Sequence, residues 1–283
     1  MTLSRPPRRT ADAGGAQADA WLTVATLNTR GVPVTGSRLA ARYQVMGEAF
    51  ETCDADVVAF QEVFTYWHLR LLARRMPSFR HVAYRPSAVG PAGGLVTFSR
   101  LPVSACSYRG LGFPAKAPGV SWQTRARAWL KGALVAEFPN PGVCVVNMHP
   151  VANRDGDWSQ AGRFFPLHQG QLSVAARVVA GAPAPAVVCG DFNIDRDSVL
   201  LRDFLSKTGL ADAFGGRCPP TFHSEYLPDS AAPAHCIDFV LTVPQLKAET
   251  TRVLFAGKQL VQGRREYLSD HVGLYAQLHR VAD

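Results

Sequence analysis

Four short apolar runs in this sequence lead into polar residues, and this pattern constrains the fold more than any other feature. Runs of this length, rich in Val, Leu and Ala, are typical of strands buried on both faces of a sheet. In layered α/β folds, polar groups at the ends of such strands converge on one rim. We therefore expect one site built from segments far apart in the chain. The runs and the polar residues after them are Leu22–Leu27 before Asn28, Val57–Phe60 before Gln61 and Glu62, Val143–Val146 before His149, and Ala186–Cys189 before Asp191 and Asn193.

The same alternation continues along the chain and predicts an α/β fold of packed sheets flanked by helices. Gly and Pro residues mark the ends of the helix-like stretches, and turn-forming residues separate the strand-like runs. Two segments with weak periodicity, 104–130 and 151–168, are predicted to be long loops. Helices are expected at about 38–53, 66–75, 168–180 and 200–210, and further strands at 93–100, 133–138, 237–242, 251–256 and 272–278.

The candidate site residues span most of the 283 residues, which favours one domain over two. We expect that domain at residues 19–283, after a disordered N-terminal arm at 1–18. The arm carries basic residues but lacks the apolar segment of a secretory signal. No apolar run approaches the length of about 20 residues that spans a bilayer. These features predict a cytoplasmic, monomeric protein, with peripheral attachment to a membrane as an alternative.

The chain has a formal net charge of +8, which suggests an anionic partner. Nucleic acid, a phosphorylated small molecule and an acidic lipid surface all fit, although a general excess of Arg over Lys accounts for part of the charge. Six cysteines are present without a Cys-x-x-Cys pair. Cys144 and Cys189 fall inside strand-like runs, where a free thiol acts as a small hydrophobe, so we expect a reducing compartment.

Glu62 follows a buried strand and is a candidate ligand for a hard cation. Hydrolysis of a phosphodiester requires neutralisation of phosphoryl charge, activation of a water and stabilisation of the leaving oxygen. Mg²⁺ suits the first task, because it binds one or two carboxylates and keeps its other positions for water or substrate. The alternative is that Glu62 is a solvated acid at a strand end.

The other polar clusters have residue types that suit proton transfer. Asp191 and Asn193 alternate across Phe192, so on an extended backbone both point the same way, although Gly-Asp-x-Asn is also a common turn. His271 follows a carboxylate, and its unperturbed pKa of about 6.5 suits a general base near neutrality. Asp238 lies in an apolar strand where an isolated charge is costly, so it needs a partner, and His271 is the candidate.

Together these residues resemble the endonuclease/exonuclease/phosphatase superfamily, which includes deoxyribonuclease I, apurinic endonucleases, inositol-polyphosphate phosphatases and neutral sphingomyelinases. The resemblance implies a four-layer α/β sandwich with two central, mostly antiparallel sheets flanked by helices. It covers about residues 21–278. The matching residues, in the order of the family, are Asn28, Gln61-Glu62, Gly94–Arg100, His149, Gly190–Asn193, Ile237-Asp238 and Ser269-Asp270-His271.

The resemblance also implies roles for these residues. Glu62, Asn28 and Asp270 would hold Mg²⁺, with Mn²⁺ as a substitute, and His271 would be the base, oriented by Asp238. The remaining roles fall to residues that would orient water, bind phosphate or contact the leaving oxygen. These are Asp191, Asn193 and His149, with Asn28, Asn193 and Lys131 as substrate-binding residues.

Two departures from the family narrow the expected substrate. Apurinic endonucleases resemble one another in a Tyr-x-Pro-Asn stretch where this chain has Asn147–Pro150, and in an Arg where it has Cys236. The deoxyribonuclease I type supports its equivalent His with a Glu in a strand that here reads Leu95–Ser99. Both departures count against DNA cleavage.

Lys131-Gly132 is similar to a Lys-Gly pair in the neutral sphingomyelinase branch. A lipid enzyme could use aromatic loops at an interface, although such residues are equally common in cores and lids. The candidates are Tyr108, Phe113, Trp122, Trp129, Trp158, Phe164 and Phe165.

The sequence therefore predicts a Mg²⁺-dependent phosphodiesterase that uses direct attack by an activated water. A sphingomyelinase-like phospholipid is the first choice of substrate. The alternatives are a metal-dependent endonuclease or exonuclease acting on DNA or RNA, favoured by the positive charge, and a non-catalytic protein that binds a phosphorylated ligand. The non-catalytic alternative ranks last because every expected site position is filled.

Overall fold

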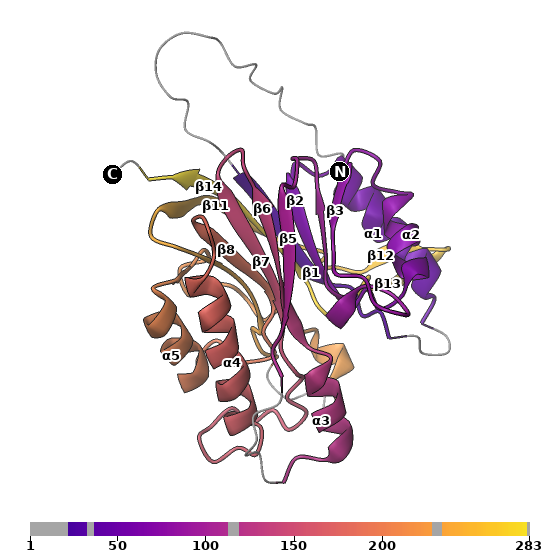
Figure 1. Ribbon diagram of the computed structural model, residues 1–283. Helices are drawn as coiled ribbons and strands as arrows, with labels where there is room; N and C mark the ends of the chain where they lie inside the picture. The colour runs from indigo at the N-terminus through magenta and orange to yellow at the C-terminus, as the bar shows by residue number, and fades with distance from the viewer. Residues whose placement is uncertain (1–21, 33–36, 113–118, 228–233, 282–283) are drawn as a thin grey trace, which may run out of the picture.

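The computed structural model describes residues 22–32, 37–112, 119–227 and 234–281, and its core is a pair of six-stranded sheets (Figure 1). The predicted N-terminal arm at 1–18 and Phe113 lie outside the described residues. None of the helices in the described part of the chain is long and apolar enough to cross a bilayer.

The first sheet has the strand order β11-β14-β1-β2-β4-β3. β1 and β2 are parallel neighbours, and the other pairs are antiparallel. The parallel register places Asn28 opposite Gln61, so the first two predicted strands end side by side. The strands are β1 (Leu22–Asn28), β2 (Val57–Gln61), β3 (His81–Ala83), β4 (Val96–Ser99), β11 (Leu246–Leu254) and β14 (Gly273–Arg280).

The second sheet repeats this arrangement with the order β5-β6-β7-β8-β10-β9. Its parallel pair is β7 and β8, again in the middle of an otherwise antiparallel sheet. A separate hairpin pairs β12 (Gln259–Val261) with β13 (Arg264–Glu266). The strands of the second sheet are β5 (Ala105–Gly110), β6 (Gly132–Phe138), β7 (Val143–His149), β8 (Ala186–Asp191), β9 (Ala211–Asp212) and β10 (Asp238–Thr242).

The two sheets pack face to face, with β1 and β2 against β7 and β8. Inward-facing Val57 and Ala59 join Val145 and Val187 in one apolar cluster. Burial of such side chains contributes about 1.5–3 kcal/mol each for a residue the size of Val or Leu. The expected mostly antiparallel central sheets are confirmed.

Helices cover the outer faces of both sheets and complete the four layers (Figure 1). α1 (Leu39–Thr52) and α2 (Tyr66–Ala73) pack on the first sheet through residues such as Phe50 and Leu72. α4 (Phe165–Ala180) and α5 (Val199–Thr208) cover the second through residues such as Leu172 and Phe204.

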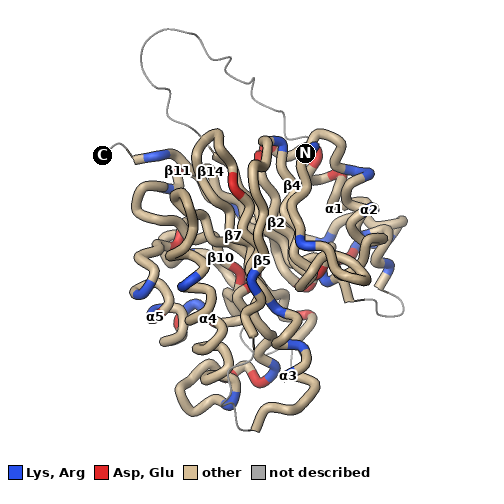
Figure 2. Tube along the Cα trace, in the orientation of Figure 1, with Lys and Arg blue, Asp and Glu red and all other residues tan. Residues whose placement is uncertain are grey.

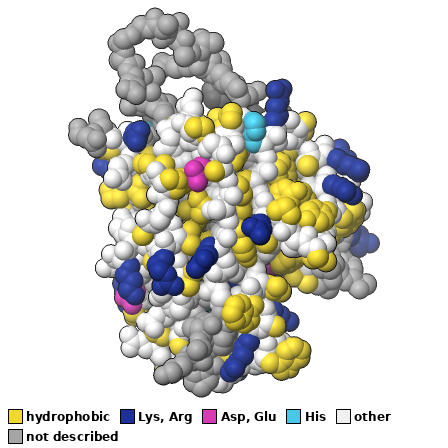
Figure 3. All heavy atoms as spheres, in the orientation of Figure 1, with side chains coloured by type: hydrophobic (Ala, Val, Ile, Leu, Met, Phe, Trp, Pro, Cys, Tyr) yellow, Lys and Arg dark blue, Asp and Glu magenta, His cyan; other side chains and the backbone are white. Residues whose placement is uncertain are grey.

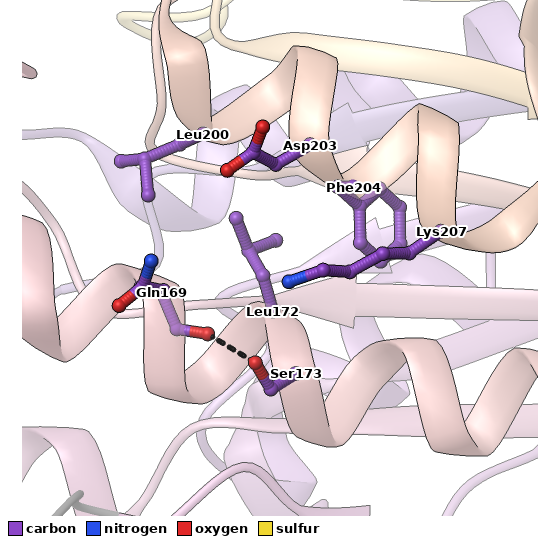
Figure 4. Close-up of a pocket in the computed structure, with 7 residues that line it drawn as sticks. All are labelled: Gln169, Leu172, Ser173, Leu200, Asp203, Phe204 and Lys207. Carbon is purple, nitrogen blue, oxygen red and sulfur yellow. Dashed lines mark hydrogen bonds between the residues drawn. The ribbon is translucent and has the colours of Figure 1, made fainter.

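A shallow pocket lies between α4 and α5 on the outer face of the molecule (Figure 4). Its wall includes Leu172, Phe204 and Lys207, and the Ser173 hydroxyl donates to the Gln169 carbonyl at 2.8 Å. The enclosed space of about 10 Å³ accommodates no more than one water, so this pocket is not a candidate substrate site.

The prediction of one long loop over 104–130 was wrong. Residues 105–110 form the edge strand β5, and α3 (Trp122–Trp129) follows, with the Ser121 hydroxyl capping its first turn. β5 is mostly exposed, so it lacks the apolar run that identified the central strands. α3 is short and polar on average, and its periodicity is correspondingly weak.

Smaller differences concern element boundaries. α4 begins at Phe165 rather than at about 168, with Pro166 in its first turn, as is common at helix starts. β11 begins at Leu246, earlier than the predicted 251, because its first half is an exposed edge with a bulge after Ala248. All six cysteines are free, and Cys144 and Cys189 are buried in strands as expected.

Candidate active site

The predicted site residues meet at the rim where the two parallel strand pairs end, which we call the catalytic rim. β1 and β2 bring Asn28 and Glu62 there from the first sheet. β7 and β8 bring His149 and Asp191 from the second, with Met148 paired to Gly190. In Figure 1 this rim lies at the lower ends of the central strands, beside α3.

Asp191 is the centre of the polar contacts. Its Oδ2 accepts hydrogen bonds from the side-chain amides of Asn28 at 2.9 Å and Asn193 at 3.1 Å. The same oxygen lies 3.4 Å from Nε2 of His149 and 3.7 Å from Nε2 of His271. Because these partners come from four segments of the chain, Asp191 links both sheets at the rim.

His271 is held from behind by Asp238, as the sequence predicted. Nδ1 of His271 lies 2.9 Å from Oδ2 of Asp238, and both side chains are buried. The Thr221 hydroxyl accepts from the backbone N–H groups of Ile237 and Asp238 at 2.9 and 3.0 Å. The ring of Phe222 stands edge-on to the imidazole at 5.1 Å. The ring of His271 is thereby fixed with Nε2 directed to Asp191.

His149 lies on the other side of Asp191 and contacts Lys131. Nζ of Lys131 is 2.9 Å from Nε2 of His149, which is 1% exposed. The pairing of Gly132 with His149 across β6 and β7 sets this contact. Lys131 therefore belongs to the site.

The protonation states of these groups follow from their burial and their neighbours. Burial alone would raise the pKa of Asp191, but His271 and His149 lower it below the usual carboxylate range. Burial raises the pKa of Asp238 to about 6. Burial opposes a charge on His271, yet Asp238 and Asp191 raise its pKa well above the usual value. Burial and Lys131 together lower the pKa of His149. In the protein alone, therefore, His271 favours the cation and His149 the neutral ring.

The backbone at two site positions adopts conformations that few residues tolerate. Asn193 has φ 54°, and its N–H donates to Oδ1 of Asp191 at 2.8 Å, a turn that Asn accommodates more readily than most residues. Gly190 has φ 134°, and a Cβ there would lie 2.1 Å from the carbonyl oxygen of Met148. The Gly-Asp-x-Asn sequence is thus both a turn and the support of the Asp191 carboxylate.

Glu62 also has a left-handed backbone, with φ 65°. This conformation costs a non-glycine residue about 1 kcal/mol or more, and such residues cluster at functional sites. Oε2 of Glu62 accepts the N–H of Gly31 at 3.1 Å, and a Cβ on Gly31 would lie 1.7 Å from the carbonyl oxygen of Glu62. Gln61, by contrast, points between the sheets and donates to Oδ1 of Asn147 at 2.8 Å. Only Glu62 of this pair is available at the rim.

Asp270 lies next to Asn28 through Ser269, whose hydroxyl donates to the Asn28 carbonyl at 2.6 Å. Its side chain is 21% exposed, and Oδ2 is 3.7 Å from Nε of Arg30. Glu62, Asp270 and the amide oxygen of Asn28 are hard oxygen donors of the kind that Mg²⁺ prefers. By the chemistry of their donor atoms, these residues suit a divalent cation.

A second group of candidate ligands fits a cation less well. Ligand atoms of Asp191, Asp238 and His271 lie within 4.8 Å of one another. The hydrogen bond between His271 and Asp238 occupies Nδ1 and one carboxylate oxygen. A metal bound by all three would compete with the contact that orients the imidazole.

The structure also identifies supporting residues that sequence reasoning missed. Thr221 and Phe222 lie in the predicted loop before β10, and Arg30 lies in the turn after β1. Their roles depend on contacts with Asp238, His271 and Asp270, distant in sequence, so no local pattern reveals them.

Two aromatic residues proposed for contact with lipid are not exposed. Phe164 is 2% exposed and packs with Ala128 and Leu167 beneath α3. Trp158 is half-buried, and its Nε1 donates to the Asn193 carbonyl at 2.9 Å. Phe164 is therefore a core residue, and Trp158 contacts the site through Asn193.

Several solved structures are similar to this one. The crystal structure of SmcL superposes with a TM-score of 0.70 at 15% identity, covering 92% of this chain and 99% of that one. Sphingomyelinase C from Streptomyces griseocarneus gives 0.63 at 19% identity, covering 91% and 99%. D. rerio TDP2 complexed with a single-strand DNA product gives 0.67 at 17% identity, covering 92% and 99%. At these identities the similarity supports the fold alone.

No curated protein matches the chain significantly by sequence. The model of the Endonuclease/Exonuclease/phosphatase family, however, matches residues 25–271, which include every proposed site residue from Asn28 to His271. Since this match covers most of the chain and agrees with the four-layer fold, the protein belongs to the endonuclease/exonuclease/phosphatase family.

Proposed function

We propose that this protein is a divalent-metal-dependent phosphodiesterase that releases the phosphorylated headgroup of a choline phospholipid of the sphingomyelin type. Members of the family are generally phosphoester hydrolases. The observation that carries the proposal is the buried network of His149, Asp191, Asp238 and His271 at the catalytic rim. Such a network positions groups that transfer protons and attract phosphoryl oxygens at the same point.

Each residue of the network has a distinct task in this proposal. Nδ1 of His271 is held by Asp238, so only Nε2 can exchange a proton with the attacking water. Asp191 and Asn193 orient that water and the phosphate. His149, in contact with Lys131, stabilises charge on the phosphoryl group or on the leaving oxygen.

The raised pKa of His271 bears on this assignment, because a protonated imidazole cannot act as a base. In the resting protein the ring attracts an anionic phosphoryl oxygen. A divalent cation held by Glu62, Asn28 and Asp270 would neutralise phosphoryl charge and oppose protonation of the neighbouring ring.

A lipid substrate is favoured over nucleic acid by two features. The chain departs from the apurinic endonuclease and deoxyribonuclease I patterns, and it has a Lys-Gly pair whose Lys131 contacts His149. The competing assignment, a nuclease, is supported by the net charge of +8.

A panel assay tests the proposal on the full chain. Purified protein is incubated with sphingomyelin in mixed micelles, supercoiled plasmid and single-stranded DNA, each with Mg²⁺, Mn²⁺ or excess chelator. We expect metal-dependent release of phosphocholine and little nicking at matched enzyme concentration, with His271→Ala as the inactive control. Metal-dependent DNA cleavage without lipid hydrolysis would establish the nuclease instead, and no turnover with any metal would favour a phosphate-binding protein.

A further inference from the structure

Large hydrophobic side chains are exposed on several connections between strands. All of the large exposed hydrophobic residues in the described segments lie in connections at the catalytic rim. Pairing of Leu254 with Gly273, and of Phe60 with Val96, places two of these connections beside the site. The residues are Val32 after β1, Trp67 after β2, Val89 before β4, Trp122, Trp129 and Leu130 between β5 and β6, and Leu260 between β11 and β14.

α3 carries the two most exposed tryptophans of this surface. Its small residues Thr124 and Ala128 face inward, whereas Trp122 and Trp129 are 74% and 66% exposed. The two Trp residues are seven positions apart, so they lie on one face of the helix. Large aromatic side chains directed to solvent, with small ones in the core, reverse the usual arrangement of a surface helix.

Positive charge accompanies these aromatic residues. Figure 2 shows Lys and Arg positions on and beside α3, and Figure 3 shows hydrophobic and basic side chains together at the lower end of the molecule. A pocket of about 370 Å³ adjoins α3 and is lined by Ser121, Gln123, Arg127 and Arg154, among others. Arg163 also lines it and is paired with Asp155. Among the described residues, Arg127 and Arg154 have no carboxylate within ion-pair distance.

The surface is continuous with the site. Leu130, 67% exposed, directly precedes Lys131, which contacts His149. Arg127 is close enough to lower the pKa of Lys131, after the larger effect of burial. A lipid surface that accommodates Trp122 and Trp129 would therefore hold its phosphate groups next to the catalytic residues.

We propose that α3 and its adjoining basic pocket form a docking surface for an anionic phospholipid bilayer. Trp122 and Trp129 enter the headgroup region, where amphipathic aromatic rings are favoured. Arg127 and Arg154 bind the phosphate of a neighbouring anionic lipid, which adds electrostatic attraction. This inference rests on the proposed lipid substrate, but it concerns attachment to the membrane rather than hydrolysis.

Vesicle co-sedimentation in excess chelator measures attachment without turnover. The full chain should bind phosphatidylcholine vesicles more tightly when they contain phosphatidylglycerol. Trp122→Ala/Trp129→Ala should lower the partition constant roughly tenfold or more on both vesicles. Arg127→Gln/Arg154→Gln should lower it to a similar extent on the anionic vesicles only. The matched control Arg74→Gln/Arg80→Gln, which removes two exposed charges outside α3 and its pocket, should bind normally.

A second measurement separates docking from catalysis. The Trp double variant should hydrolyse a water-soluble phosphodiester at the normal rate but lose activity on vesicles. Normal vesicle binding without lipid hydrolysis would refute the proposed substrate and leave the docking surface intact. Unchanged vesicle binding by both double variants would overturn the inference. Double variants that bind vesicles normally and lose only the binding of single-stranded DNA would also overturn it. Thermal unfolding of each variant excludes misfolding as the cause of a loss.

Discussion

The two sides of the candidate site differ in how completely the protein satisfies their charges. On one side, His149, Asp191, Asp238 and His271 are each at most 5% exposed and are joined by contacts of 2.9 to 3.7 Å. On the other, Glu62 and Asp270 are partly exposed. Glu62 accepts one backbone N–H. Asp270 has Nε of Arg30 at 3.7 Å, the Ser269 hydroxyl at 3.2 Å and Nε2 of His271 at 3.9 Å. One side is a closed network, and the other has open carboxylates.

This difference separates the charged groups that the protein itself pairs from the carboxylates that remain accessible to a ligand. A buried charge requires a partner, so the closed network is part of the stability of the domain. Partly exposed carboxylates contribute little to stability but can exchange water for a cation.

The largest effect is expected from Asp191→Asn, which keeps the volume of the side chain and removes its charge. Turnover should fall by about a thousandfold. The change also leaves His271 with one fewer anionic neighbour in a buried place, so the free energy of unfolding should fall by about 3 kcal/mol. Turnover and urea unfolding measure the two losses. A loss of activity with unchanged stability would show that the network is not a structural unit.

Glu62→Gln tests the other side and should separate activity from stability. The substituted amide can still accept the N–H of Gly31 but binds a divalent cation weakly. We expect turnover to fall about a hundredfold at saturating Mg²⁺, while the free energy of unfolding changes by less than about 0.5 kcal/mol. Glu48→Gln, an exposed change on α1, is the matched control and should alter neither turnover nor the free energy of unfolding. A clearly destabilised Glu62→Gln would contradict the division into closed and open sides.

The residues at the ends of central strands were the most predictable part of the site, because they follow the strongest strand signals. Asn28, His149 and Asp191 end apolar runs that could only be central strands, and their meeting at one rim follows from the topology. The partnership of Asp238 and His271 was predicted from the cost of an isolated buried charge. The partner of a buried charged group can be predicted from the sequence, because burial leaves few possible partners.

The surroundings of the site were less predictable. α3 was read as a loop because its eight residues include only two that are buried, so it has no apolar stripe. Phe164 and Trp158 were candidates for contact with lipid, with a core or lid position as the alternative; one fills the space beneath α3 and the other donates to Asn193. Composition shows that a segment has aromatic residues but does not show which way they face. That direction depends on tertiary contacts.

The last prediction concerns the support behind the closed network, which should make stability depend on pH. His168 on α4 is fully buried, and its Nε2 donates to the carbonyl of Val151, near His149. Burial lowers its pKa to about 4 from 6.5. Between these values the unfolded chain binds more protons, so stability is complete above pH 6.5 and declines as the pH falls toward 4. The total loss is about 3 kcal/mol, at most about 1.4 kcal/mol per pH unit.

The variant His168→Gln keeps a donor for Val151 but cannot titrate. The difference in unfolding free energy between this variant and the wild type should therefore change by about 3 kcal/mol between pH 6.5 and pH 4. Equal slopes for wild type and His168→Gln would rule out His168 as a titrating element of the closed side.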